Sequence, residues 1–380
     1  MGPLQGRHVI EFAGIGPAPF CGMLLADLGA DLVRIERPDG RGGDLPLPPE
    51  ADLLNRGKRS IVVDLKQPAG LDVVLRLVGR ADALIEGYRP GVMERLGLGP
   101  DVCLTRNPRL VYGRMTGWGQ EGPLAPRAGH DIGYIGLAGA LHMIGRRGGP
   151  PAVPLNVVGD FGGGALYLAV GVLAGMLEAS RSGRGQVVDA AIVDGTASLL
   201  TVFHGLLAAG LWSEQRGVNL LDSGCPWYDA YETSDGLWMA VGSIEPRFYE
   251  ALLVGLGLDA ADLPGQWDRD RWPELRARLA TRFRDRTRAE WERIFAGADA
   301  CVAPVLSLSE AAVHEHARTR EAFVEVEGIR QPSPAPRFSR TPGRVRRGPP
   351  RPGDHTDEVL LEHGLTRAEV DALRRGGAVA

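Results

Sequence analysis

The chain has 380 residues, which exceeds the usual size of one compact domain and favours two domains. Hydrophobic residues make up 44% of it and charged residues 24%, proportions that are ordinary for a globular protein and argue against a disordered chain. The formal net charge of −4 at pH 7 argues against a nucleic-acid-binding protein, which would need a basic surface.

The first half of the sequence alternates short apolar strands with helices. We expect strands at residues 9–13, 31–36, 60–65, 83–86 and 110–114, and helices at 17–28 and 71–78. This alternation is typical of a doubly wound parallel sheet with helices on both faces, so the predicted fold class is α/β. Ligands of such sheets bind beyond the carboxyl ends of the strands.

The pattern changes after about Asp222. Two strands at 227–233 and 237–242 flank a Ser-Asp-Gly turn, and three predicted helices follow at 246–256, 274–284 and 288–295. We therefore predict a large α/β domain over residues 1–221 and a smaller α+β domain over 222–325. Residues 326–380 are expected to form a return segment and a C-terminal helix, beginning near Thr356, that rejoin the large domain.

The sequence offers little support for a metal site or a membrane span. The four cysteines are scattered without zinc-ligand spacing, so we expect reduced thiols, no metal and a cytoplasmic enzyme. The N-terminus has no apolar signal segment. An apolar run at 161–177 is shorter than the roughly 20 residues of a membrane helix, and we interpret it as a buried core helix.

One motif imitates a dinucleotide-binding fingerprint. Gly14 and Gly16 follow a strand, and Glu36 ends the next strand about 20 residues later. The third glycine of the fingerprint, needed for close helix packing, is replaced by Pro19. We therefore expect a plain strand-to-helix turn, whose backbone amides are candidates for contact with a substrate, and no nicotinamide cofactor.

His130 and Asp160 each lie at the mouth of a predicted helix. If they faced one substrate carbon, they could remove a proton from one side and return one from the other. Gly162–Gly164 would let a substrate approach backbone N–H groups that hold an enolate oxygen. Each residue alone also fits a structural role, Asp160 as a helix N-cap and His130 as a helix-start residue paired with Asp131.

Three further charged residues have two readings each. Glu245 precedes a helix, where it is either a first-turn charge or a carboxylate that orients a histidine. Arg37 and Arg89 are each followed by proline just after a predicted strand end. They are either solvated surface residues or ligands of phosphate groups.

The sequence resembles the α-methylacyl-CoA racemases of the family III CoA-transferase superfamily along nearly its whole length. The stretches that carry the resemblance are residues 11–17, 26–31, 84–91, 115–120, 185–190 and 355–360.

The resemblance implies a cofactor-independent racemase that interconverts (2R)- and (2S)-2-methylacyl-CoA thioesters through an enolate. It implies that His130 and Asp160 are the acid/base pair, that Glu245 supports His130, and that Arg37 and Arg89 contact the CoA part of the substrate. It also implies an interlocked homodimer, in which the small domain of one subunit closes the active site of the other.

Two alternatives remain at this point. A CoA-transferase would use Asp160 as a nucleophile and pass through an acyl anhydride. A non-catalytic CoA-binding or oligomeric scaffold would use neither residue chemically. The pairing of His130 with Glu245 favours the racemase, because a transferase would not need it.

Overall fold

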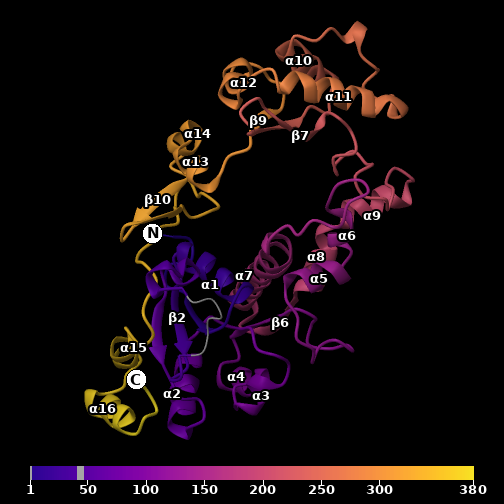
Figure 1. The fold of residues 1–380 in the computed structure, drawn as a ribbon. Coiled ribbons are helices and arrows are strands. Elements are labelled where there is room, and N and C mark those ends of the chain that lie inside the picture. Colours follow the sequence, from indigo (N-terminus) through magenta and orange to yellow (C-terminus); the bar gives the residue numbers. More distant parts are fainter. Residues whose placement is uncertain (1, 41–46) are drawn as a thin grey trace. The chain divides into compact units, whose positions relative to one another are not determined.

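The computed structural model describes residues 2–40 and 47–380 (Figure 1). The chain forms two compact units. The first contains residues 1–138, 155–200 and 318–380, and the second contains 139–154 and 201–317. The sequence-based division placed 139–154 and 201–221 in the large domain. They pack in the second unit because Arg216 donates hydrogen bonds to the carbonyl oxygens of His142 and Gly149.

The first unit is built on a six-stranded parallel sheet, which confirms the predicted α/β class. Its strands, in the order β3-β2-β1-β4-β5-β6, are Arg59–Val62, Asp31–Glu36, His8–Phe12, Ala83–Glu86, Val111–Thr116 and Gln186–Ala191. The last of these is an additional edge strand that the periodicity did not predict. The strand order reverses between β1 and β4, so the ligand crevice of this fold class is expected at their carboxyl ends.

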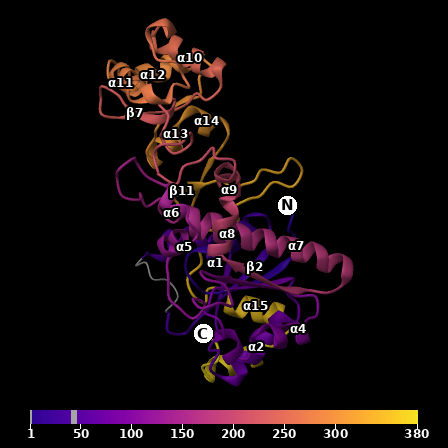
Figure 2. The ribbon, with the colours of Figure 1, turned by 90° about the vertical axis from the view of Figure 1, so that its right-hand side faces the viewer.

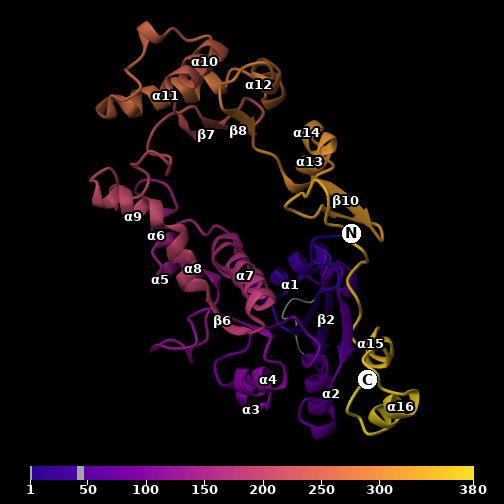
Figure 3. The ribbon, with the colours of Figure 1, turned by 180° about the vertical axis from the view of Figure 1, so that it is seen from behind.

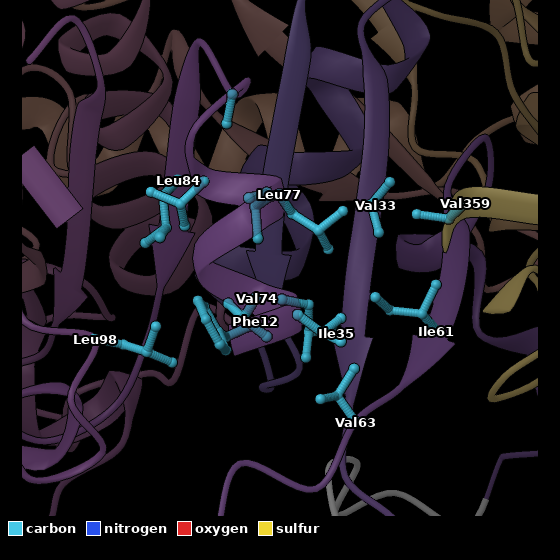
Figure 4. Close-up of a cluster of buried hydrophobic side chains, with 14 of the residues drawn as sticks. Phe12, Val33, Ile35, Ile61, Val63, Val74, Leu77, Leu84, Leu98 and Val359 are labelled. Carbon is cyan, nitrogen blue, oxygen red and sulfur yellow. The ribbon is translucent and has the colours of Figure 1, made fainter. Parts of the chain in front are cut away.

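Helices cover both faces of this sheet. They are α1 (Pro17–Asp27), α2 (Pro68–Val78), α3 (Val92–Arg95), α4 (Pro100–Arg106), α5 (Asp131–Leu137), η3 (Val157–Ala165), α7 (Leu166–Ser182), α8 (Ile192–Leu199), α15 (Thr356–Glu362) and α16 (Arg367–Arg375). Strand residues alternate between two cores: Ile10 and Phe12 face α2 and α15, whereas Val9 faces α1 and α7. Figure 4 shows the first core, in which Val359 of α15 lies beside Ile61.

The segment Val157–Ser182, formed by η3 and α7 (Figure 2), is long and apolar enough to cross a membrane by length and composition. The mean hydropathy of its most apolar 18-residue stretch is 1.6. We predicted a buried core helix here, and this holds for one face only, since 39% of its most apolar stretch is buried. Leu168 and Val172 pack on the sheet. Val170 and Leu177 are 65% and 64% exposed, so α7 presents an apolar outer face.

The C-terminal segment returns to the first unit, and its helix begins at Thr356 as predicted. Figure 3 shows α15 and α16 beside the sheet, where α15 contacts β3. The guanidinium of Arg59 holds α15 through ion pairs with Glu358 and Glu362, at 2.9 and 2.6 Å. Val359 and Leu360 complete the first core, so the last residues of the chain are part of the sheet domain.

The second unit contains a three-stranded antiparallel sheet of β7 (Tyr228–Glu232), β8 (Trp238–Gly242) and β9 (Val302–Pro304). The predicted hairpin is confirmed, and β9 adds a third strand that the sequence did not reveal. Helices α10 (Pro246–Leu256), α11 (Trp272–Phe283) and α12 (Arg288–Phe295) pack on it around buried aromatic rings. The unit also includes α6 (Ala140–Met143), α9 (Thr201–Ala208) and α13 (Leu308–Val313).

We predict that Leu360→Ala lowers the free energy of unfolding of the first unit by about 2–5 kcal/mol, because it removes a fully buried side chain from the core. The control Leu47→Ala removes the same atoms from a side chain that is 49% exposed, and its effect should stay below about 0.5 kcal/mol. Urea denaturation followed by circular dichroism measures both. Equal losses in the two variants would contradict the role of α15 in this core.

Candidate functional site

His130 is the N-cap residue of α5, as its position in the sequence predicted. Its backbone is extended, with φ −136° and ψ 169°, and its carbonyl oxygen accepts the Gly133 N–H at 2.8 Å. The imidazole is exposed and has no hydrogen-bond partner among residues 2–40 and 47–380. The ring is therefore available to a ligand at the start of the helix.

Asp160 is not an N-cap, and this alternative from the sequence is wrong. The helix begins four residues earlier than expected, with Asn156 at the N-cap, and its first nine residues form the π-helix η3. The Phe161 N–H accordingly bonds to the Asn156 carbonyl oxygen, five residues back. Asp160 lies in the wide first turn, where N–H groups lack intrahelical partners. Short π-helical segments are frequent at functional sites.

Asp131 joins the two helix starts. Its Oδ1 accepts the backbone N–H of Asp160 at 2.7 Å, so α5 is bonded directly to η3. We expected Asp131 to pair with His130, but its carboxylate turns the other way, into the protein, where it is 6% exposed. Its second oxygen, Oδ2, is buried without a hydrogen-bond partner among the described residues. The Asp131 carboxylate therefore fixes the position of the Asp160 backbone.

The Asp160 carboxylate lies against the turn that follows β1. A Cβ atom at Gly16 would stand 3.2 Å from Oδ2 of Asp160, and Gly16 has a φ of +65°, which favours glycine. The side-chain amide of Asn156 donates to the same oxygen at 3.2 Å. The Gly14–Gly16 motif is thus a strand-to-helix turn that lets the backbone approach Asp160 closely.

Neighbouring charges act on Asp160. Burial raises its pKa above the ordinary value, and the charge of Asp131 raises it further. The hydrogen bond from Asn156 and the positive charge of His130 lower it. His130 and Asp160, which are separated by 30 positions in the sequence, are therefore electrostatically coupled within the first unit.

Gly163 and Gly164 do not form part of the substrate surface that we predicted over Gly162–Gly164. A Cβ at Gly163 would lie 2.5 Å from Oγ1 of Thr196, and one at Gly164 would lie 3.0 Å from Ile192. Both glycines are buried, so they let η3 pack closely against α8. Their small size serves packing, because larger side chains would push η3 away from α8.

Two aromatic residues that the sequence analysis missed line the same region. The Tyr134 ring packs edge-on against Trp118, with ring centroids 4.7 Å apart. Gly117 and Gly129 make room for it, since Cβ atoms there would lie 2.0 and 2.6 Å from its ring. Burial raises the pKa of Tyr134, the charge of Asp160 raises it further, and the charge of Arg89 lowers it. Both glycines precede Tyr134 in the chain, so no local sequence pattern showed that they surround its ring.

Arg37 and Arg89 follow the carboxyl ends of β2 and β4, as predicted. Arg37 is exposed and forms an ion pair with Asp39 at 2.9 Å. Arg89 is exposed, and its guanidinium has no partner within the described part of the chain. Burial raises the pKa of Tyr88, and the positive charge of Arg37 lowers it. Because Arg89 directly follows Tyr88 in the chain, both arginines lie near this residue. Guanidinium groups at this edge suit a phosphate-bearing ligand.

Glu245 lies in the second unit as the N-cap residue of α10. It is exposed, and its carbonyl oxygen accepts the N–H groups of Phe248 and Tyr249 at 3.0 Å. Its charge also contributes to the raised pKa of Cys301, after burial and Asp299. Its support of His130 stays a prediction.

Other features of the surface do not form part of this site. A cavity of about 190 Å³ lies at the opposite edge of the sheet, where its lining includes Arg7, Asp82 and Arg109, before β1, β4 and β5. Within residues 2–40 and 47–380, no group of three or more His, Cys, Asp or Glu side chains is arranged to hold a metal ion.

The chain belongs to CoA-transferase family III, whose family model matches residues 4–356. It is 47% identical over 369 residues to the alpha-methylacyl-CoA racemase of Mus musculus, covering 97% of this chain and 95% of the relative. It is 46% identical over 373 residues to the alpha-methylacyl-CoA racemase of Homo sapiens, covering 97% and 96%. The crystal structure of a CAIB/BAIF family protein from Brucella suis matches with a TM-score of 0.82 at 26% identity, covering 95% and 99% of the two chains.

We predict that Asp160→Asn stabilises the folded protein at neutral pH. Because burial raises the pKa of Asp160 above 3.8, the folded state binds this proton more tightly than the unfolded chain does. The ionised carboxylate therefore lowers stability once the pH exceeds the folded-state pKa, and this effect fades as the pH falls towards 3.8.

Thermal denaturation of Asp160→Asn and the unaltered protein across this pH range measures the difference. The matched control is Asp72→Asn, at an exposed position on α2, which should shift Tm little at any pH. A gain for Asp160→Asn that grows with decreasing pH would contradict the predicted sign.

Proposed function

We propose that this protein interconverts the (2R) and (2S) epimers of 2-methylacyl-CoA thioesters by removing and returning the α-proton. The observation that carries the proposal is geometric: the buried Asp131 carboxylate bonds the helix that begins at His130 to the backbone of Asp160, so that both titratable groups lie at joined helix starts. The resemblance to racemases at 46–47% identity supports the same activity.

The proposed reaction uses two groups on opposite sides of one carbon. The thioester carbonyl acidifies the α-proton, and either His130 or Asp160 removes it, depending on the epimer. The enolate oxygen accepts hydrogen bonds from backbone N–H groups, for which the first turn of η3 and the Gly14–Gly16 turn are the candidates. The other group then protonates the opposite face. A raised pKa suits Asp160 for this exchange, because a stronger base removes a weakly acidic proton more readily.

The CoA moiety of the proposed substrate provides phosphate groups that the protein can bind. Arg37 and Arg89, at the carboxyl ends of β2 and β4, are proposed to bind the phosphates of the CoA moiety. Coenzyme A enters as part of the substrate, and the proposed steps use no metal or redox cofactor.

We further propose that the protein is a cytoplasmic interlocked homodimer. The supporting observation is the apolar outer face of α7, where Leu166, Val170 and Leu177 are 48%, 65% and 64% exposed. Apolar surface of this kind favours burial against another protein surface. In the proposed dimer the second unit of one subunit brings Glu245 to His130 of the other, where its carboxylate stabilises the imidazolium.

We expect the unaltered enzyme to exchange the α-proton of a 2-methylacyl-CoA with deuterium in D2O while racemising it, without an acceptor acid. His130→Ala and Asp160→Ala should each lower this rate by about 10²–10⁴-fold, the usual effect of losing a general acid or base. NMR follows the deuterium, and chiral chromatography follows the epimers.

The controls are His8→Ala and Asp72→Ala, which remove an exposed imidazole at the first residue of β1 and an exposed carboxylate on α2. Both should retain the activity. Transfer of CoA to a second acid, with hydroxylamine trapping of an Asp160 anhydride, would replace the racemase by a CoA-transferase. Binding of CoA without any turnover would leave a non-catalytic protein.

We expect a mixed dimer of Glu245→Gln and His130→Ala subunits to recover about half of the unaltered activity from two nearly inactive parents. If Glu245 acts across the interface, one site of the mixed dimer carries both changes and the other carries neither. Co-expression with two different tags is needed, because interlocked subunits do not exchange readily after folding. Mixed dimers no more active than either parent would refute a site shared between subunits.

A further inference from the structure

The face of the sheet that packs on α1 contains a buried charged network. Lys58, one of two lysines in the chain, is fully buried, and its ammonium group donates to both carboxylate oxygens of Glu11, at 2.9 and 2.7 Å. It also donates to the carbonyl oxygen of Pro19 at 3.0 Å and to Oδ1 of Asn55 at 3.1 Å. Arg34 donates to Glu11 at 2.7 Å from the neighbouring strand.

Burying this charged network costs more free energy of desolvation than burying apolar side chains of the same size. Burying an ion pair sacrifices the hydration of both charges, and well-packed apolar residues often stabilise a fold as much or more. Burial accordingly lowers the pKa of Lys58 to about 8, although the charge of Glu11 acts in the opposite direction. Apolar contacts depend little on the orientation of the groups that make them, whereas hydrogen bonds do. The hydrogen bonds of Lys58 therefore fix the relative positions of β1, α1 and the segment before β3.

Helix α1 lies directly on this network. A Cβ atom at Gly22 would stand only 1.8 Å from Oε2 of Glu11, so the helix backbone is pressed against the carboxylate. Lys58 holds the carbonyl oxygen of Pro19, which lies in the first turn of the same helix. The height and rotation of α1 over the sheet are therefore set by the network.

The first turn of α1 is also the wall beside Asp160. Gly16, its N-cap, approaches the carboxylate, and a Cβ at Gly164 would lie 3.2 Å from Pro17. The ring of Phe20 stacks on Phe161, with centroids 4.5 Å apart. The same turn is thus held by Lys58 on one side and meets η3 on the other.

We propose that Lys58 and Glu11 are positioning residues for the racemase, holding the Gly14–Pro17 turn against the Asp160 carboxylate through helix α1. This rests on the proposed role of Asp160 in proton transfer. Neither residue touches the substrate. Their effect on the reaction is to keep the backbone wall at the distance from Asp160 that the proton transfer requires, since small misplacements near reacting groups cost large factors in rate.

The test compares Lys58→Met with a destabilising change on the other face of the sheet. Lys58→Met removes the hydrogen bonds and keeps an unbranched chain. The control Val74→Ala removes buried carbon atoms of α2 from the opposite core. For each variant we would measure Tm, kcat for racemisation, the Kd for free CoA, and amide hydrogen exchange of the peptide covering residues 14–20.

Lys58→Met is expected to lower kcat for racemisation by about 10–100-fold, with little change in the Kd for CoA. It should also speed the amide hydrogen exchange of residues 14–20. Val74→Ala should lower Tm while leaving kcat and this exchange unchanged. If Lys58→Met does not fold, Glu11→Gln, which keeps the shape of the side chain, gives the decisive comparison, with an effect in the same direction.

A folded variant with the kcat of the unaltered enzyme would overturn the proposal. A loss of kcat in Val74→Ala as large as that in Lys58→Met would overturn it equally, because the effect would then follow stability alone. The exchange measurement does not depend on activity. If the unaltered enzyme does not exchange the α-proton of the substrate with deuterium, the proposed function is wrong. If the amide hydrogen exchange of residues 14–20 is unchanged in Lys58→Met, the positioning role is refuted separately.

Discussion

The geometry around Asp160 depends on one hydrogen bond, from its backbone N–H to the buried carboxylate of Asp131. This bond connects the first turns of α5 and η3 and so fixes the carboxylate of Asp160 relative to the helix that begins at His130. The π-helical start of η3 makes it possible, because the wide first turn leaves the N–H of Asp160 free for an acceptor outside its own helix.

Glycines near this hydrogen bond let the neighbouring elements pack closely around Asp160. Gly16 admits the turn after β1 to the carboxylate, and Gly163 lets η3 settle on α8. Tyr134 fills the space above Gly117 and Gly129. Side chains at these positions would separate elements that must touch, so the glycines act through close approach of packed elements and only in part through backbone conformation.

Two sets of buried charges lower the stability of the first unit, one partly buried at Asp160 and one fully buried at Glu11 and Lys58. Asp160 is held half-buried beside a second carboxylate, and its raised pKa is the expected consequence. Below it, Glu11 and Lys58 form a fully buried pair whose hydrogen bonds reach the first turn of α1. Buried charge of this kind persists where the surrounding packing is strong, and here two apolar cores enclose the sheet on both faces.

The sequence by itself determined the parallel α/β sheet, the hairpin of the second unit and the place of His130 at a helix start, because these follow from local periodicity and turn residues. It also placed Arg37 and Arg89 after strand ends. Only the tertiary structure decided that Asp131 binds Asp160, that Asn156 caps η3 and that Gly163 serves packing. These contacts join positions far apart in the chain or depend on a π-helical turn, and local residue patterns do not encode which distant backbone a side chain meets.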